Sequence, residues 1–173
     1  LTIGAGGINS AGNMSLTAAG TLFQSGNIST TAGGAILAIA NSATFNNITS
    51  AGNIGIETDA ITITNPINAG TNGVYIMPRN NNAISIDGVA AFNLTQGELN
   101  NITAGNLFIG YNGGTTTRAT TAAISTNAST TIGGTTTIVQ ALNGITFGAN
   151  NFTATGADIG FQTVNAGTNV TTG

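Results

Sequence analysis

A short phrase returns along this 173-residue chain about every 20 residues. An isoleucine or valine is followed by a small polar step and a glycine, as in INSAGN at 8–13, ITSAGN at 48–53 and VNAGTN at 164–169. A repeat of this length is typical of solenoid proteins, in which each repeat packs only on its neighbours. The aligned residues are Ile8, Ile28, Ile48, Ile67, Ile86, Ile102, Ile124, Ile145 and Val164.

Between these positions lie short runs in which apolar residues alternate with any other residue. Examples are IGI at 54–56, VYI at 74–76 and LFI at 107–109. Such triplets between glycine, asparagine or serine predict strands of about three to five residues. Only 94–99, around TQGEL, could form a turn of helix. Two or three short strands in each repeat predict an all-β chain, a parallel β-helix (β-solenoid).

The repeat also predicts the size and core of this β-helix. We expect about nine coils of roughly 20 residues, and the variable coil length, between 16 and 22 residues, favours the right-handed form. Residues 1–173 are expected to form a single β-solenoid segment of a longer repetitive chain or fibre. The nine aligned residues are predicted to form one inward stack. The aromatic candidates for neighbouring stacks are Phe23, Phe45, Phe92, Phe147, Phe152 and Phe161.

Composition excludes several classes of protein. The net charge is −3 and the only cationic side chains are Arg79 and Arg118, so a nucleic-acid-binding surface is not expected. The longest apolar run has six residues, 35–40, whereas a membrane helix needs about 20, so no membrane insertion is expected. The absence of cysteine excludes disulfide bonds and thiolate metal sites.

The inventory of reactive side chains also argues against an enzyme. The chain lacks histidine, cysteine and lysine, which supply most bases and activated nucleophiles. Glu57 and Asp59 could form an acid–base pair, although the same spacing occurs on any solvated face. Asp87 and Asp158 could contribute to a calcium site, but they are also typical turn residues in Asx turns. Glu98 is expected to cap or pack at a corner. We therefore expect no catalytic residues, cofactor or metal.

Repeated threonines suggest a further alternative. Thr115–Thr117 and Thr135–Thr137 lie one coil apart, and Thr153 with Thr155 could continue a ladder of the kind that ice-binding solenoids display. Threonine also suits exposed strand positions in any sheet. Residues 78–83 and 110–122 are expected to leave the coil as loops, where binding would concentrate.

The stretch FNLTQGELNNITAGNLFIG, at 92–110, resembles a recurring phrase of large bacterial exoproteins of the filamentous haemagglutinin family. Units such as SAGN at 10–13 and TAGG at 31–34 resemble the roughly 20-residue repeats of that family. The resemblance implies a right-handed parallel β-helix, exported by a two-partner or similar route and displayed on the cell surface as an adhesin. The secretion-domain signature of that family is missing, so this segment is expected to be shaft.

Two functions follow as expectations. The first is an adhesive shaft of a secreted bacterial surface protein that mediates attachment to surface glycans or proteins of a host or of other bacteria. The second is a self-assembling extracellular fibre or sheath subunit, because solenoid ends expose unpaired strand edges that template association. Its partner would be the chain itself, stacked end to end or continued by more solenoid.

Overall fold

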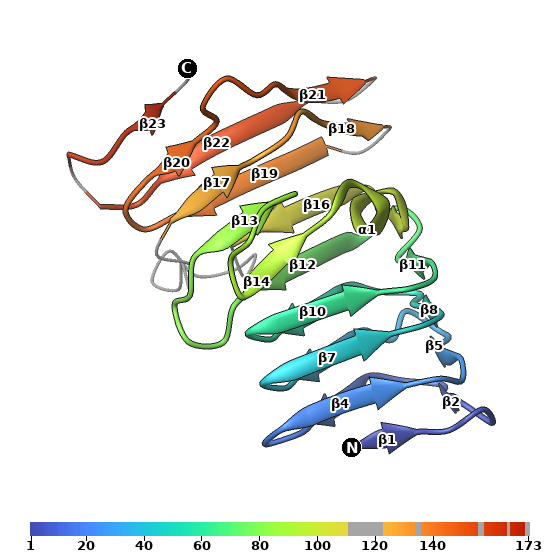
Figure 1. The fold of residues 1–173 in the computed structure, drawn as a ribbon. Helices are drawn as coiled ribbons and strands as arrows, with labels where there is room; N and C mark the ends of the chain where they lie inside the picture. Colours follow the sequence, from blue (N-terminus) through green and yellow to red (C-terminus); the bar gives the residue numbers. More distant parts are fainter. Residues whose placement is uncertain (111–122, 134–135, 156–157, 166, 172–173) are drawn as a thin grey trace.

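The chain winds into a parallel β-solenoid whose laps stack on one another (Figure 1). The computed structural model describes residues 1–110, 123–133, 136–155, 158–165 and 167–171. It has about seven turns with roughly 21 residues per turn, rather than the nine coils that the repeat predicted. The count is lower because residues near 78–101 form extra elements instead of a further lap.

Each lap of the first half contributes one strand to each of three sheets, and every strand pair is parallel. Sheet A contains β1 (Thr2–Ile3), β4 (Thr21–Gln24), β7 (Ser42–Phe45) and β10 (Ala60–Ile63). Sheet B contains β2 (Ile8–Ser10), β5 (Ile28–Thr30), β8 (Ile48–Thr49), β11 (Ile67–Asn68) and β15 (Ile102–Thr103).

Sheet C runs through both halves of the rod. Its strands are β3 (Met14–Thr17), β6 (Ile36–Ile39), β9 (Ile54–Glu57), β12 (Gly73–Met77), β16 (Asn106–Ile109), β19 (Thr136–Ala141) and β22 (Ile159–Thr163). Sheet D follows sheet A on the near face of Figure 1 and contains β14 (Phe92–Leu94), β13 (Ile84–Ile86), β17 (Ile124–Thr126), β20 (Ile145–Thr146) and β23 (Val170–Thr171). The remaining elements are the paired strands β18 (Thr130–Gly133) and β21 (Phe152–Thr155) and helix α1 (Gln96–Asn100).

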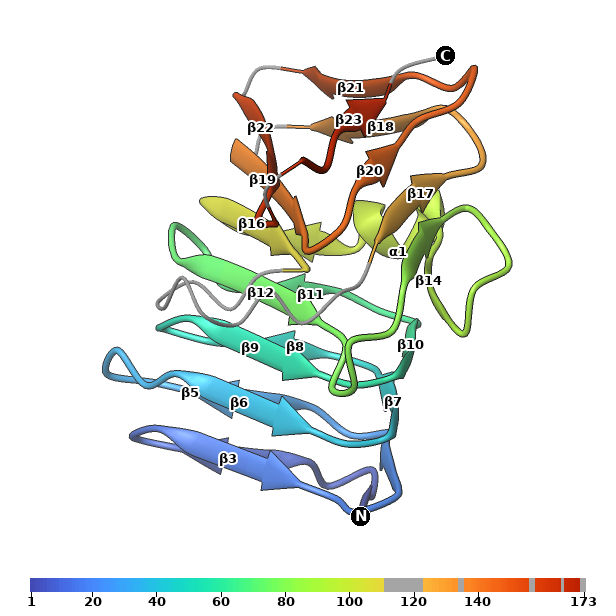
Figure 2. The same cartoon turned by 90° about the vertical axis from the view of Figure 1, so that its left-hand side faces the viewer.

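The coil is right-handed, as the sequence predicted. In Figure 1 the chain climbs from the N-terminus at the bottom, while β4, β7 and β10 run from left to right on the near face. Figure 2 shows the left-hand side of Figure 1, where β6 and β9 run toward the face that is nearest the viewer in Figure 1. A chain that passes in front from left to right as it climbs describes a right-handed helix.

The recurring isoleucines lie on top of one another in sheet B. Ile28 pairs with Ile48, and Ile48 pairs with Ile67. Each of the three is at most 1% exposed, because the lap above and the lap below cover it. At the two ends of this stack, Ile8 pairs with Ile28 and is 38% exposed, and Ile102 pairs with Ile67 and is half-buried.

The other four aligned residues do not belong to this stack, which corrects the prediction of a single column. Ile124 and Ile145 pair with each other in sheet D, where Ile84 rather than Ile86 is the partner of Ile124. Ile86 pairs instead with Thr126 and Leu94 in the same sheet.

Val164 lies just after β22 and is 39% exposed. The residue that pairs with Ile145 is Val170, not Val164 as expected. The column divides because β13, β14 and α1 are inserted between β12 and β15. The next residue in register with Ile67 therefore comes 35 residues later.

The aromatic side chains also divide between inside and outside. Phe45, Phe92 and Phe147 are buried, and Phe152 and Phe161 pack partly buried against the core. Phe23, which the sequence placed among the inward stacks, is 45% exposed. In β4 the residues before and after Phe23 are buried. Because successive side chains of a strand point to opposite faces, the Phe23 ring points outward.

Residues of α1 and its C-cap bond to the last residue of sheet A's upper strand, β10. The Oε1 atom of Glu98 accepts the backbone N–H of Ile63 at 2.9 Å, and the Asn101 side chain donates to the Ile63 carbonyl at 3.3 Å. The same carboxylate completes a capping box with Thr95. At Ile63, side chains take the place of a further strand as hydrogen-bond partners. The helix and its capping box confirm both the predicted helical turn and the capping role of Glu98.

Truncating a central stack residue should cost far more stability than truncating a terminal one. We expect Ile48→Ala to lower the free energy of unfolding by about 2–5 kcal/mol, because a fully buried side chain leaves a cavity. Ile8→Ala should lower it by about 1 kcal/mol or less, since that side chain is already partly in water. Urea unfolding of both variants measures the difference, and equal losses would contradict the stacked register.

Removing the Glu98 carboxylate should open the edge of sheet A. We expect Glu98→Ala to cost about 1–3 kcal/mol, because the Ile63 N–H loses its acceptor in a partly buried setting. The exposed, isosteric change Thr62→Val on the outer face of β10 is the control and should alter stability by about 0.5 kcal/mol or less. Thermal and urea unfolding compare the two. A Glu98→Ala variant as stable as the control would show that α1 does not protect this edge.

Candidate functional site

The outer face of sheet C carries a column of outward-facing residues, one from each lap. Leu37 pairs with Gly55, Gly55 with Tyr75, and Tyr75 with Phe108. The rings of Tyr75 and Phe108 stack with centroids 4.5 Å apart and planes inclined by 3°. The stack arises because the strand register places these outward positions one above the other, about 4.8 Å apart.

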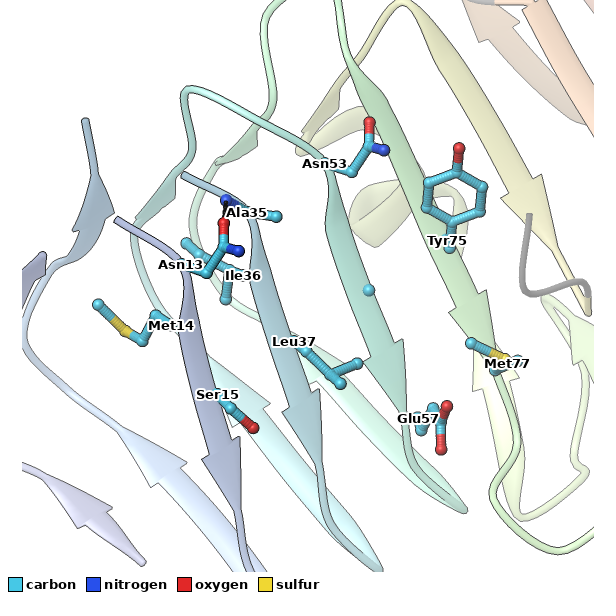
Figure 3. A pocket seen from close by; sticks show the side chains of 11 residues that line it. Asn13, Met14, Ser15, Ala35, Ile36, Leu37, Asn53, Glu57, Tyr75 and Met77 are labelled. Carbon is cyan, nitrogen blue, oxygen red and sulfur yellow. Dashed lines mark hydrogen bonds between the residues drawn. The ribbon is translucent and has the colours of Figure 1, made fainter. Parts of the chain in front are cut away.

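A groove interrupts this column at Gly55. It has a volume of about 510 Å³ and extends over the outer face from β3 across β6 and β9 to β12, with the part over β9 lying between Leu37 of β6 and Tyr75 of β12 (Figure 3). Leu37 reaches over from one wall, while Tyr75 and Met77 stand on the other. Asn53, just before β9, and Glu57, at its end, lie toward the two ends of the groove.

Glycine at position 55 leaves space that its backbone does not require. The residue lies in the middle of a strand and is not among the residues with positive φ. A Cβ atom there would lie 3.2 Å from the Cδ1 atom of Leu37 and would enter the groove. Glycine within a strand weakens it and often marks a place where another group approaches closely.

A second glycine positions the aromatic wall. A Cβ atom on Gly73 would lie 2.8 Å from the Tyr75 ring, so the missing side chain allows the ring to lie back across the strand. Phe108 then holds the ring from the neighbouring lap. The aromatic surface is therefore fixed by its neighbours before any ligand arrives.

Two asparagines fix the polar end of the groove. The Oδ1 atom of Asn53 accepts the backbone N–H of Gly73 at 2.9 Å, and Oδ1 of Asn13 accepts that of Ala35 at 2.9 Å. Both side chains are exposed. Because the oxygen of each amide faces the next strand, its NH₂ group is directed away from that bond and presents donors near the groove.

A second hollow lies in the last described laps. It has a volume of about 360 Å³ and is bordered by residues 147–153 and by Phe161. Phe147, Phe152 and Phe161 meet there edge to face, with centroids 4.8–6.1 Å apart. These rings belong to the core, and their partial exposure reflects their position near the end of the described stack.

The loop expected at 78–83 is tied to the preceding lap. The carboxylate of Asp59 accepts the backbone N–H of Asn80 at 2.9 Å and side-chain N–H groups of Asn80 and Asn82 at 2.5 and 3.0 Å. Arg79 donates to the Asn41 side chain at 2.8 Å. The second expected loop, 110–122, lies outside the described residues apart from Gly110.

The remaining carboxylates lie in different settings. Asp59 is engaged by the 78–83 loop, whereas Glu57 stands half-buried on the outer face of sheet C, so the two sit in different settings. Asp87 has a φ of 51° and accepts the backbone N–H of Gln96 at 2.9 Å, which ties it to α1 instead of forming the expected Asx turn. Asp158 is exposed.

No cluster of three or more potential metal-ligating residues occurs within the described ranges. In the same part of the chain, no helix has the length and hydrophobicity needed to cross a bilayer. That the chain has no catalytic activity stays a prediction.

Among the described residues, the threonines expected in the ladder do not share one outer face. Thr137 is fully buried and pairs with Leu107 and Ile159. Thr153 is exposed but pairs with Thr131, and Thr155 pairs with Gly133. Residues 115–117 and 135 lie outside the described part of the chain.

The groove was not predicted from the sequence, although its signal was present. The triplets IGI, VYI and LFI each place their central residue outward, and those residues are Gly55, Tyr75 and Phe108. The outer residues of each triplet belong to the core, whereas the central residues form the column. Comparison with protein-family models, curated proteins and solved structures finds no match to this chain.

The Tyr75–Phe108 stack should show a measurable coupling. We expect Tyr75→Ala and Phe108→Ala to be non-additive, with a coupling of about 0.5–1.5 kcal/mol in a double-mutant cycle of unfolding free energies. The control cycle combines Tyr75→Ala with Phe147→Ala, which belongs to a different aromatic group, and should be additive within about 0.5 kcal/mol. Additivity in the first cycle would show that the stack does not hold the wall.

Proposed function

We propose that this chain is a segment of a secreted β-helix displayed on a bacterial cell surface, where it serves as an adhesive shaft. The parallel β-solenoid is the architecture that the resemblance of residues 92–110 to filamentous haemagglutinin-like exoproteins implies. The proposal assigns the chain no catalysis and no cofactor. Its partners would be glycans or proteins of other surfaces.

The observation that carries the proposal is the outer face of sheet C. This sheet contains seven strands and continues through both halves of the rod. Its outward column presents Leu37, Tyr75, Phe108 and Ile138 at half-buried or exposed positions. A line of apolar and aromatic side chains along a rod offers a contact surface that a charged or uniformly polar face would not.

A self-assembling fibre or sheath is the second candidate. The stack residues of the first and last described laps are more exposed than those between them, with Ile8 at 38% and Val170 at 41%. Further solenoid, from the same chain or from another copy, would cover these side chains and pair the terminal strands. Ice binding is a third and more remote candidate, for which thermal hysteresis is the direct measurement.

An attachment assay tests the proposal. Beads coated with the purified chain should retain bacterial or epithelial cells above the level of beads coated at equal density with albumin, and free chain should compete. Retention equal to the control would contradict an adhesive role. Electron microscopy of the same sample would favour the fibre if filaments lengthen as protein concentration rises.

A further inference from the structure

We propose that the groove over Gly55 binds the ring of a neutral pyranose from a surface glycan. This assignment rests on the proposed attachment function, and it names both the site and the class of ligand. The site consists of Gly55 as the floor, Leu37 and Tyr75 as the walls, and Asn53 and Glu57 at the ends.

The dimensions of the groove fit one ring. Leu37 and Tyr75 lie on strands two spacings apart, a separation of about 9.6 Å between strand axes. The position between them has no side chain of its own, because Gly55 occupies it, although Leu37 leans over it with its Cδ1 atom 3.2 Å from where a Cβ atom would lie. A sugar ring would pack above the Gly55 backbone, between Leu37 and Tyr75.

Tyr75 supplies the surface on which such a ring would pack. One side of a pyranose carries several C–H groups and is apolar, and an aromatic ring with its negative face attracts those groups. The Tyr75 ring is seen broadside in Figure 3 and borders the groove. Since Gly73 and Phe108 already hold it in place, little conformational entropy is lost on binding.

Hydrogen-bonding groups stand where the hydroxyls of the sugar would lie. Asn53 presents amide donors at one end of this subsite, with its orientation fixed by a bond to Gly73 of the neighbouring strand. Glu57 lies at the other end. Sugar hydroxyls accept as well as donate, so the amide donors of Asn53 are complementary to them.

Charge favours a neutral glycan over a sulfated or sialylated one. The described residues that line the groove include one carboxylate, Glu57, and no arginine. The whole chain also carries a net charge of −3. An anionic sugar would be repelled, because like charges that face each other across an interface are unfavourable.

Calorimetric titration of the intact chain tests the proposal. The probes are cellohexaose, maltohexaose and chitohexaose as neutral saccharides, with a heparin hexasaccharide as the anionic one. We expect saturable binding of at least one neutral probe. Binding of the heparin probe alone, or of no saccharide, would overturn the assignment, as would binding only of a tryptophan-containing peptide run in parallel.

Two variants locate the binding. Gly55→Val suits a strand and narrows the groove, but its Cβ atom would lie 3.2 Å from the Leu37 Cδ1 atom, so Leu37 must shift and urea unfolding verifies that the variant folds. It should bind at least tenfold more weakly, or about 1.4 kcal/mol. Tyr75→Ala should weaken binding by a similar factor. Gly160→Val is the matched control, because Gly160 lies in the same outward column beside Ile138 and away from the groove. Its affinity should equal that of the parent.

The outcomes separate this inference from the proposed function. Unchanged affinity in a folded Gly55→Val variant would overturn the site even if coated beads still retain cells. Conversely, saturable sugar binding that Gly55→Val abolishes, together with beads that retain no cells, would support the site and contradict the adhesive role.

Discussion

In-register stacking of parallel laps is the constraint on which the rest of this structure depends. Each lap places an aliphatic side chain on that of the lap before, and Ile28, Ile48 and Ile67 show the result in sheet B. The arrangement buries them almost completely and pairs the backbone of most strands with the laps on both sides, except at sheet edges such as β10 and β15. With four per cent charged residues, the chain has few long-range charge pairs to stabilise it, so packing and strand pairing must supply most of its stability.

The sequence predicted the parts of the fold that repeat. Periodicity identified the parallel β-helix and its hand, and the isoleucines of the first laps lie where it placed them. It could not predict where the repeat is interrupted. Ile86 comes 19 residues after Ile67, as a further lap would require, yet β13 enters sheet D and α1 is inserted before the chain returns to sheet B at Ile102. Spacing alone does not distinguish a new lap from an excursion of equal length.

The same limit applies to the outer face. Core positions are recognised residue by residue, because an apolar side chain in an alternating run must be buried. An outward position has no such requirement, and its role depends on which residues lie beside it in the laps above and below. Tyr75 is an ordinary half-buried tyrosine in its own triplet, and Gly55 is an ordinary weak point in its own strand. Only the register, which sets Gly55 between Leu37 and Tyr75, turns the two into a groove.

This relation explains how a repetitive rod can carry a specific site without disturbing its core. Inward and outward positions alternate along every strand, so a change at an outward position leaves the stack behind it intact. Ile54 and Ile56, on either side of Gly55, remain fully buried although the residue between them has no side chain. The inner column fixes the spacing of the laps, and that spacing in turn fixes the distance between the walls of the groove. Selectivity can therefore be set by single residues on the outer face, while the repeat that defines the fold remains unchanged.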